Sequence, residues 1–365
     1  MRIVWVGKEP EPGGRAGDEV FDNRSIAALR QLGHEVERLH PRRVSRLREM
    51  ANLVLGVPHY RSWYADRGNQ ARVEAAARDA DALVISWEPL DVLRAPPGTA
   101  ALLILHNVTS QSLPALFPGS RIPALLASFA GRWERRRYRA DEAKAVAALS
   151  RRDMAFLAAI PGVAPVVLTL PGMPPLEPLA EDAVLVRELV VSGTYDWTPK
   201  RRDLLQFLRE YRSVADRVPV LGDGWPPEAE AILRPQPLPA GDISREIRFG
   251  IVSDRFEAGH KLKTGAYIAA NQIVLSFSDA GHDFEGIPDR DLFIRRVAHA
   301  SDIGGHIASV ASIPPDELRD RLRLFKQRCA ERFRWSGVAE TIAQVLEAQL
   351  AEAGRISSAG SSKPA

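Results

Sequence analysis

The chain has 365 residues, of which 45% are hydrophobic and 26% are charged, and its formal net charge is +3. This composition is typical of a globular protein long enough for two domains, and it excludes an intrinsically disordered chain. A single cysteine, Cys329, excludes an internal disulfide framework. With no apolar stretch long enough to span a bilayer, we expect a cytoplasmic protein.

Short apolar runs alternate with helical patterns over the first half of the chain. Strands are predicted at 2–7, 34–39, 81–86, 101–106, 145–150 and 165–170, and helices at 23–33, 68–79, 122–139 and 151–159. Such alternation is typical of βαβ units and predicts a parallel sheet. The long loop before the first helix carries Gly13 and Gly14, which either close over a ligand or form ordinary turns.

A proline-rich stretch interrupts this alternation, and we interpret 171–186 as a linker between domains 1–170 and 187–334. The second domain repeats the pattern, with strands predicted at 188–193, 218–223, 247–253 and 272–278, and helices at 199–211 and 261–271. Helical patterns follow at 314–333 and 335–354, and the small polar residues within 351–365 favour a disordered tail. No G-x-G-x-x-G sequence occurs, which argues against a dehydrogenase.

The charge is uneven along the chain. Residues 1–170 carry 24 Lys and Arg against 18 Asp and Glu, whereas the remainder carries 25 against 28. Two arginine-rich segments, Arg42–Arg48 and Arg132–Arg139, are either solvated helix faces or contacts for anionic lipid headgroups or an anionic acceptor. Nucleic acid is not expected as a partner, because the net charge is modest and no recognition motif occurs.

The segment "SDRFEAGHKLKTG" (253–265) places a glycine and two lysines where a predicted strand gives way to a helix. Ligands bind at the carboxyl ends of parallel strands, and a helix N-terminus favours an anion. We therefore predict a phosphate site here, against the alternative of an exposed basic turn. Its expected residues are Gly193, Lys200, Arg255, Gly259, Lys261, Lys263 and Thr264.

Further candidates follow other predicted strands. His106 directly follows the apolar residues 101–105 at the end of a predicted strand, where a histidine either faces a ligand or caps the strand, and Asn107 is its weaker companion. Asp283 and Glu285 follow the strand 272–278 and either bind ribose or sugar hydroxyls or form a polar loop. No Cys/His spacing of the zinc type occurs, so no metal site is predicted.

The order of several segments resembles the GT-B glycosyltransferases, and among them the family 4-like group that uses nucleotide sugars. The segments are "LHNVTSQS", "LPGMPP", "VVSGTYDWTPKRRDLLQFL", "FGIVSDRFEAGHKLKTGAYIAANQIV" and "FRWSGVAETIAQVL". The resemblance covers about residues 1–350. It implies an α/β fold of two Rossmann-like domains facing each other across a cleft, with the C-terminal helix, 335–350, crossing back to the first domain.

The resemblance also implies an activity. Such enzymes transfer a sugar from a nucleoside diphosphate donor, bound on the second domain, to an acceptor on the first, with retention and without a metal or other cofactor. His106 and Glu257 would be catalytic, and Gly13, Gly14 and Asn107 would contact the acceptor or form a closing loop. Because the first domain is basic, we expect the acceptor to be a glycan or a lipid-linked glycan of the exopolysaccharide type, at the inner face of the cell membrane.

The sequence departs from this family at one motif. Family members carry two glutamates eight positions apart, and the matching positions here are Ala258 and Ala266, with Glu257 beside the first. Two alternatives to a transferase therefore stay open, namely a nucleotide-sugar 2-epimerase-like isomerase and a non-catalytic nucleotide-sugar-binding homologue. The base and sugar of the donor are not fixed by the sequence.

Overall fold

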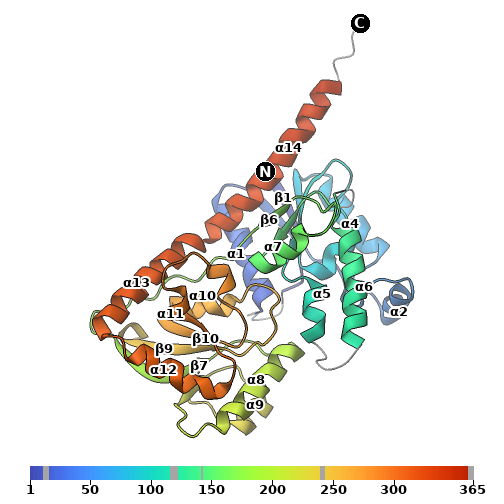
Figure 1. The fold of residues 1–365 in the computed structure, drawn as a ribbon. Coiled ribbons are helices and arrows are strands. Elements are labelled where there is room, and N and C mark those ends of the chain that lie inside the picture. The colour runs from blue at the N-terminus through green and yellow to red at the C-terminus, as the bar shows by residue number, and fades with distance from the viewer. Residues whose placement is uncertain (11–15, 116–121, 141–142, 239–242, 361–365) are drawn as a thin grey trace. The chain divides into compact units, whose positions relative to one another are not determined.

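The computed structural model of the chain describes residues 1–10, 16–115, 122–140, 143–238 and 243–360. The chain forms two compact units (Figure 1). Unit 1 contains Met1–Pro171 together with the residues from Trp335 onward, and unit 2 contains Gly172–Arg334. Each unit is built on one parallel sheet, as expected of βαβ units.

Unit 1 has a six-stranded sheet in the order β2-β1-β3-β4-β5-β6, with every neighbouring pair parallel. Its strands are β1 (Arg2–Val6), β2 (Glu35–Leu39), β3 (Ala82–Ser86), β4 (Ala100–Leu105), β5 (Val146–Ala148) and β6 (Val166–Leu168). The central strands β3 and β4 are buried along their whole length, because helices cover both faces.

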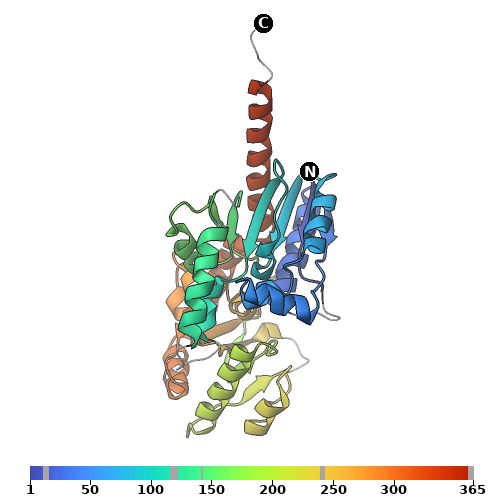
Figure 2. The ribbon, with the colours of Figure 1, turned by 90° about the vertical axis from the view of Figure 1, so that its right-hand side faces the viewer.

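The helices of unit 1 fall on the two faces of this sheet. They are α1 (Gly17–Gln31), α2 (Arg46–Val54), α3 (His59–Ser62), α4 (Arg67–Ala77), α5 (Thr109–Ser112), α6 (Ile122–Arg137), α7 (Arg151–Ala158) and α14 (Trp335–Gly360), with 3₁₀ turns η1 (Glu88–Val92) and η2 (Leu113–Ala115). Residues Ile3 and Trp5 of β1 face α1 and α14, whereas Val4 and Val6 face the opposite core. Figure 2 shows α14 beside this sheet.

Unit 2 has a five-stranded parallel sheet in the order β11-β10-β9-β7-β8. Its strands are β7 (Val184–Val191), β8 (Val220–Gly222), β9 (Glu246–Val252), β10 (Gln272–Ser276) and β11 (Ile294–Arg296). Its helices are α8 (Thr198–Arg212), α9 (Pro227–Ile232), α10 (Leu262–Ala269), α11 (Arg290–Phe293), α12 (Ile303–Ala311) and α13 (Pro315–Arg332), with 3₁₀ turns η3 (Ile243–Arg245), η4 (His282–Phe284) and η5 (Ala300–Asp302).

Some elements differ from the expected ones. Helix α1 begins at Gly17, inside the stretch predicted to be loop, and Asp18 and Glu19 in its first turn interact favourably with the helix dipole. Strand β7 begins at Val184, within the segment interpreted as a linker. Helix α14 continues to Gly360, although small polar residues placed 351–365 in a tail.

One arginine of the predicted basic surface is not at the surface. Arg137 is buried, and its guanidinium donates to the carbonyl oxygens of Asp91 and Leu93, the latter at 2.7 Å. These bonds satisfy a buried charge inside unit 1, so the expectation that the whole Arg132–Arg139 segment contacts lipid is wrong for Arg137. No helix of the described residues is long and apolar enough to cross a bilayer.

Candidate functional site

A cluster of polar side chains lies where β7 and β9, neighbours in the sheet of unit 2, reach their carboxyl ends. The loop after β7 supplies Gly193 and Tyr195, and the loop after β9 leads into α10. We call this cluster the Lys263 site. Its members are Gly193, Tyr195, Asp254, Lys261, Lys263 and Thr264.

Lys263 lies at the centre of this cluster. Its Nζ is 4.3 Å from the centre of the Tyr195 ring and is shielded from solvent without a hydrogen-bond partner among the described residues. A Cβ added at Gly193 would lie 2.8 Å from this Nζ and closer still to Cε, and Gly193 has a φ of 128°. Only glycine therefore fits beside the lysine without strain.

Burial sets the charge state of Lys263. It lowers the pKa of the ammonium group to about 8, with Asp254 acting in the opposite direction and the nearby Lys200 lowering the pKa further. The group is therefore protonated at pH 7, but its positive charge is not neutralised by a hydrogen-bonded carboxylate. Lys200 lies in the first turn of α8 and is half-buried.

Asp254 is the acid of the Lys263 site. Its Oδ2 lies 3.8 Å from the Nζ of Lys261, and its Oδ1 is buried with no partner among the described residues. Burial raises the pKa of this carboxyl, but Lys261, Lys263 and Lys200 together hold it below its ordinary value. Asp254 is therefore ionised, and it carries one negative charge among three lysines.

Lys261 and Thr264 complete the cluster at the first turn of α10. The Nζ of Lys261 lies 3.6 Å from the centre of the Phe256 ring and donates to the carbonyl oxygen of Ala258 at 3.1 Å. The Oγ1 of Thr264 is buried and has no partner among the described residues. Buried polar atoms are nearly always paired, and the first turn of a helix also has unpaired N–H groups, so this arrangement suits an anion with several oxygen atoms.

Arg255, expected in this site, points elsewhere. Its backbone N–H donates to Asp203 at 2.7 Å, and its guanidinium donates to Glu210 at 2.6 Å. Both partners are carboxylates of α8, so this arginine ties the β9–α10 loop to that helix.

The predicted acids of unit 2 are also engaged locally. Glu257 accepts a hydrogen bond from the Asp279 N–H at 3.0 Å and lies 3.4 Å from the guanidinium of Arg296. Asp283 lies 2.7 Å from the Nδ1 of His260. Glu257 thus contacts residues at and beyond the end of β10, whereas Asp283 contacts the loop between β9 and α10.

The remaining predicted positions in unit 2 have simple environments. Glu285 is exposed and lies 3.0 Å from the Nδ1 of His282. Gly259 has a φ of 68°, the left-handed conformation that glycine adopts without a steric penalty. Of the two positions where the family carries glutamates, Ala258 is buried and Ala266 is exposed on α10.

A second group of polar residues lies at the carboxyl ends of β3 and β4 in unit 1. The hydroxyl of Ser86 donates to Oδ1 of Asp22 at 2.6 Å, and its Oγ lies 2.9 Å from Nε2 of His106. The Phe21 ring meets the imidazole edge-on at 5.1 Å between centres. We call Asp22, Ser86 and His106 the His106 network.

The hydrogen-bond pattern fixes the tautomer of His106. Because the one hydroxyl proton of Ser86 goes to Asp22, Nε2 of His106 donates to Ser86, and Nδ1 of a neutral ring is left as an acceptor. Burial lowers the pKa of His106, and burial likewise raises that of Asp22, each opposed by the attraction between the two groups. The lowered pKa of His106 favours the neutral imidazole at pH 7.

Other candidates in unit 1 have less defined surroundings. Asn107 is half-buried beside His106. Gly13 and Gly14 lie outside the described residues. Glu88, which follows β3, has a buried Oε2 with no partner among the described residues, and burial raises its pKa to about 7. The residue before it, Trp87, has a φ of 91°, a strained conformation of the kind that gathers at functional sites.

Sequence reasoning missed Asp22, Ser86, Glu88 and Asp254. Three of them had a usable signal, because Ser86, Glu88 and Asp254 come at or just after the carboxyl end of a predicted strand. Asp22 had none, since its stretch was expected to be loop and only the start of α1 at Gly17 orients it. Among the described residues, no group of three or more His, Cys, Asp or Glu is placed to hold a metal ion.

Comparison with known proteins identifies the architecture. No family model and no curated protein matches the chain. Its structure is similar to an alpha,alpha-trehalose-phosphate synthase (UDP-forming) from Burkholderia vietnamiensis, with a TM-score of 0.55, 12% identity and coverage of 95% of this chain and 99% of the other. AviGT4, a glycosyltransferase involved in avilamycin A biosynthesis, has a TM-score of 0.50, 15% identity and coverage of 96% and 98%. The chain has the GT-B fold.

The GT-B fold confirms the fold class expected from the sequence, with two parallel-sheet α/β domains and a C-terminal helix that belongs to the first. At this level of identity the likeness concerns the fold. Because one fold hosts many functions, the residues of the two sites must carry the functional argument.

Proposed function

We propose that this GT-B chain is a glycosyltransferase that moves a sugar from a nucleoside diphosphate sugar to an acceptor. The observation that carries the proposal is the Lys263 site, where a buried ammonium group and a buried hydroxyl at the start of α10 have no partner in the part of the chain that the structure describes. A diphosphate offers the charge and the oxygen atoms to satisfy both. Proteins of the same fold include a UDP-forming synthase and a glycosyltransferase, which agrees with such a ligand.

The Lys263 site would act by stabilising the leaving group. As the sugar–phosphate bond breaks, negative charge develops on the diphosphate, and fixed cations nearby lower the free energy of the transition state. Lys263, Lys261 and Lys200 would supply that charge, Thr264 and the first turn of α10 would donate hydrogen bonds, and Asp254 pairs with Lys261 at 3.8 Å. Because the lysines would take the part of a metal ion, we propose that the reaction needs no metal. Activity that is abolished by EDTA and restored by Mn²⁺ would overturn that part of the proposal.

His106 is proposed as the residue of unit 1 that contacts the transferring sugar. Ser86 and Asp22 hold the ring in one orientation, as they would need to do for a group that acts only when substrate is bound. The acceptor, proposed to be a glycan or a lipid-linked glycan of the exopolysaccharide type, would bind unit 1, with Asn107, Gly13 and Gly14 near it. Retention of the anomeric configuration rests on the family resemblance.

The remaining predicted residues keep secondary parts in the proposal. Glu257 could contact the sugar only after breaking its ion pair with Arg296. Asp283 and Glu285 could do so only after breaking their contacts with His260 and His282, respectively. Arg255 orders the loop that carries the Lys263 site through its bonds to α8.

The proposed location is the cytoplasm, with peripheral contact at the inner face of the membrane. The exposed arginines of Arg42–Arg48 and of Arg132–Arg139, without Arg137, are the proposed contacts with anionic headgroups.

A non-catalytic nucleotide-sugar binder is the second candidate. It is favoured by Ala258 and Ala266 at positions where family members carry glutamates, because a ligand there would lose two carboxylate contacts. Binding of a donor with no turnover on any acceptor would identify this alternative.

The deciding experiment is binding of a panel of nucleosides, nucleoside diphosphates and nucleotide sugars to the wild-type chain and to Lys263→Met. We expect the variant to lose about thirtyfold in affinity for the preferred nucleoside diphosphate, and nothing for the nucleoside, since one charge-assisted contact is removed.

Lys326→Met is the matched control. Lys326 is a buried lysine of the same unit, but its ammonium group already donates to the carbonyl of Glu177 at 2.6 Å and to Asn271. Its loss should lower thermal stability and leave the ratio of diphosphate to nucleoside affinity unchanged. The proposal fails if no nucleoside diphosphate binds, or if both variants change this ratio equally.

A further inference from the structure

Helix α2 of unit 1 is amphipathic in the opposite sense to a normal surface helix. Leu47, Met50, Ala51 and Val54 are spaced to share one face of it, and Leu47, Met50 and Val54 are 86%, 62% and 86% exposed. We call these four residues the α2 stripe. A surface helix ordinarily turns its apolar face to the core, so this stripe is oriented toward something outside unit 1.

The polar residues of α2 hold the helix in this orientation. Asn52 is buried, and its side-chain amide donates to the carbonyls of Ser62 at 2.9 Å and Ala65 at 2.8 Å. The carboxylate of Glu49 accepts from the Trp63 indole at 2.8 Å. Because these bonds face inward, rotating the α2 stripe into the protein would break all three of them.

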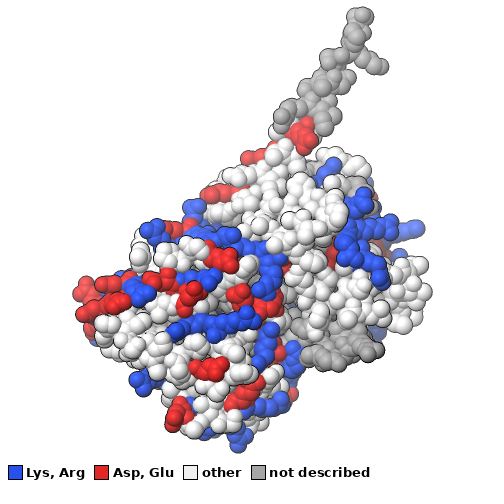
Figure 3. All heavy atoms as spheres, viewed as in Figure 1, with Lys and Arg blue, Asp and Glu red and all other residues white. Residues whose placement is uncertain are grey.

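The apolar surface continues beyond the α2 stripe. Leu55, directly after the helix, is 75% exposed. Gly56 lies next to the Phe129 ring of α6, since a Cβ added there would be 4.0 Å from it. Leu125 and Leu126 of α6 are exposed as well. Figure 1 shows α2 and α6 as neighbours in unit 1, and Figure 3 shows uncharged surface at α2 with basic side chains next to it.

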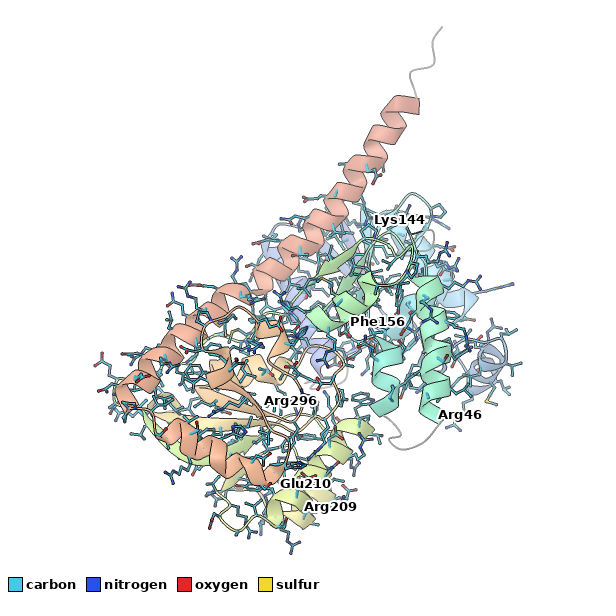
Figure 4. The ribbon with its side chains drawn as sticks, viewed as in Figure 1. Arg46, Lys144, Phe156, Arg209, Glu210 and Arg296 are labelled. Carbon is cyan, nitrogen blue, oxygen red and sulfur yellow. The ribbon has the colours of Figure 1, made fainter. Side chains whose placement is uncertain are left out.

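Three of the arginines that flank this surface have no carboxylate partner among the described residues. Arg42, Arg46 and Arg48 are exposed and form no ion pair with any described residue; Figure 4 labels Arg46. The one acid of the helix, Glu49, is turned inward. Two copies of this surface facing each other would bring arginine against arginine, so the charge pattern disfavours self-association and suits a negatively charged surface with an apolar layer beneath it.

We infer that the α2 stripe inserts into the interfacial layer of an anionic lipid bilayer, while the arginines beside it contact lipid phosphates. This deepens the membrane contact proposed above from attraction of charges to insertion of apolar side chains. It does not depend on sugar transfer, since binding to vesicles can be measured without donor or acceptor.

The test is flotation of the full chain with vesicles of phosphatidylcholine containing about 30% phosphatidylglycerol, at low and at high salt. We expect Leu47→Asn/Val54→Asn to lower the partition coefficient about tenfold at low salt and to remove binding at high salt. Arg46→Gln/Arg48→Gln should lose about tenfold at low salt only, because salt already screens these charges. Leu324→Asn, at a leucine of α13 that is 47% exposed, is the matched control and should bind as the wild type.

Insertion has its own readout. Cys329 is fully buried, so a cysteine introduced by Met50→Cys can be labelled selectively with an environment-sensitive dye. Vesicles should shift its emission to the blue, and the same dye on Leu324→Cys should not respond. The inference is overturned if the wild type does not float, or if Leu47→Asn/Val54→Asn floats equally well. Bound protein without a blue shift, or a wild-type dimer that this double variant dissociates, would also overturn it.

Discussion

The Lys263 site of unit 2 and the His106 network of unit 1 both lie at the carboxyl ends of neighbouring strands in their respective sheets, yet their polar groups are satisfied differently. In the His106 network each member bonds to the next, from the imidazole through Ser86 to Asp22. In the Lys263 site the Nζ of Lys263 and the Oγ1 of Thr264 are buried without partners among the described residues.

This difference separates two kinds of functional residue. Unpaired buried polar groups destabilise the folded protein, typically by about 1–3 kcal/mol each, so we expect a ligand to pair with those of the Lys263 site. A closed network stabilises the fold by itself and holds one side chain in a fixed orientation. We therefore propose the Lys263 site as a binding site and the His106 network as a positioning device.

The largest expected effect is from Gly193→Ala. The added Cβ collides with the Lys263 side chain at a backbone conformation unfavourable to alanine, so we expect about a hundredfold loss of nucleoside diphosphate affinity. Gly286→Ala is the matched control, because Gly286 has a φ of 81° and no heavy atom within 4 Å of the added Cβ. Equal losses in calorimetric titrations of both variants would trace the effect to backbone strain and not to Lys263.

The next effect is kinetic. His106→Ala should lower kcat by about thirtyfold and change the donor Kd by less than about twofold, because a contact made only during transfer has that signature. His59→Ala, at an exposed histidine of the same unit, should change neither value. Normal turnover per folded molecule, with a lowered Tm, would make His106 a structural residue.

A stability measurement sharpens the comparison directly. Ser86→Ala should lower the free energy of unfolding by about 1–2 kcal/mol, since it leaves Asp22 and His106 without their shared partner. Thr264→Val should raise it by about 1 kcal/mol, because the hydroxyl that it removes is buried without a partner among the described residues. If chemical denaturation shows Thr264→Val to be as destabilising as Ser86→Ala, the Thr264 hydroxyl is hydrogen-bonded in the folded protein, and the contrast between the two sites is wrong.

The smallest effect is on pH dependence. Lys263 is charged below its pKa of about 8 and loses its charge as the pH rises through that value. Nucleoside diphosphate affinity should therefore be constant below pH 7 as far as this lysine is concerned, and should fall by about tenfold between pH 7 and pH 9. The same titration with Lys263→Met should be flat over that range, and a parallel fall in both proteins would assign the titration to another group.

The sequence predicted most strands because they are short apolar runs, too short for a typical helix and alternating with helical patterns. Strands β3, β4 and β9 are buried along nearly their full length, and their ends therefore marked His106 and Lys263 as candidates. Family resemblance added the order of the two domains and the return of the C-terminal helix. The edge strand β11 was missed, since its three residues include two arginines.

What the sequence could not show is which side chains pair. Arg255 and Lys263 look alike as cations near a strand end, yet the guanidinium of Arg255 is paired with Glu210 of α8, whereas the Nζ of Lys263 has no hydrogen-bond partner among the described residues. Arg137 and Arg136 are adjacent in the chain, but only Arg137 is inside. These differences depend on contacts with residues distant in sequence, which local patterns do not encode.

Helix α14 has a consequence for how the chain is made. One face of the unit 1 sheet is covered by Val338, Ile342 and Leu346 of this helix, which are translated only after all of Gly172–Arg334. Domains tend to fold as units while synthesis proceeds, so unit 2 can complete its core first while unit 1 waits with apolar strands uncovered. The half of the protein that leaves the ribosome earliest is thus the last to finish folding, and during that interval it is the part most in need of a chaperone.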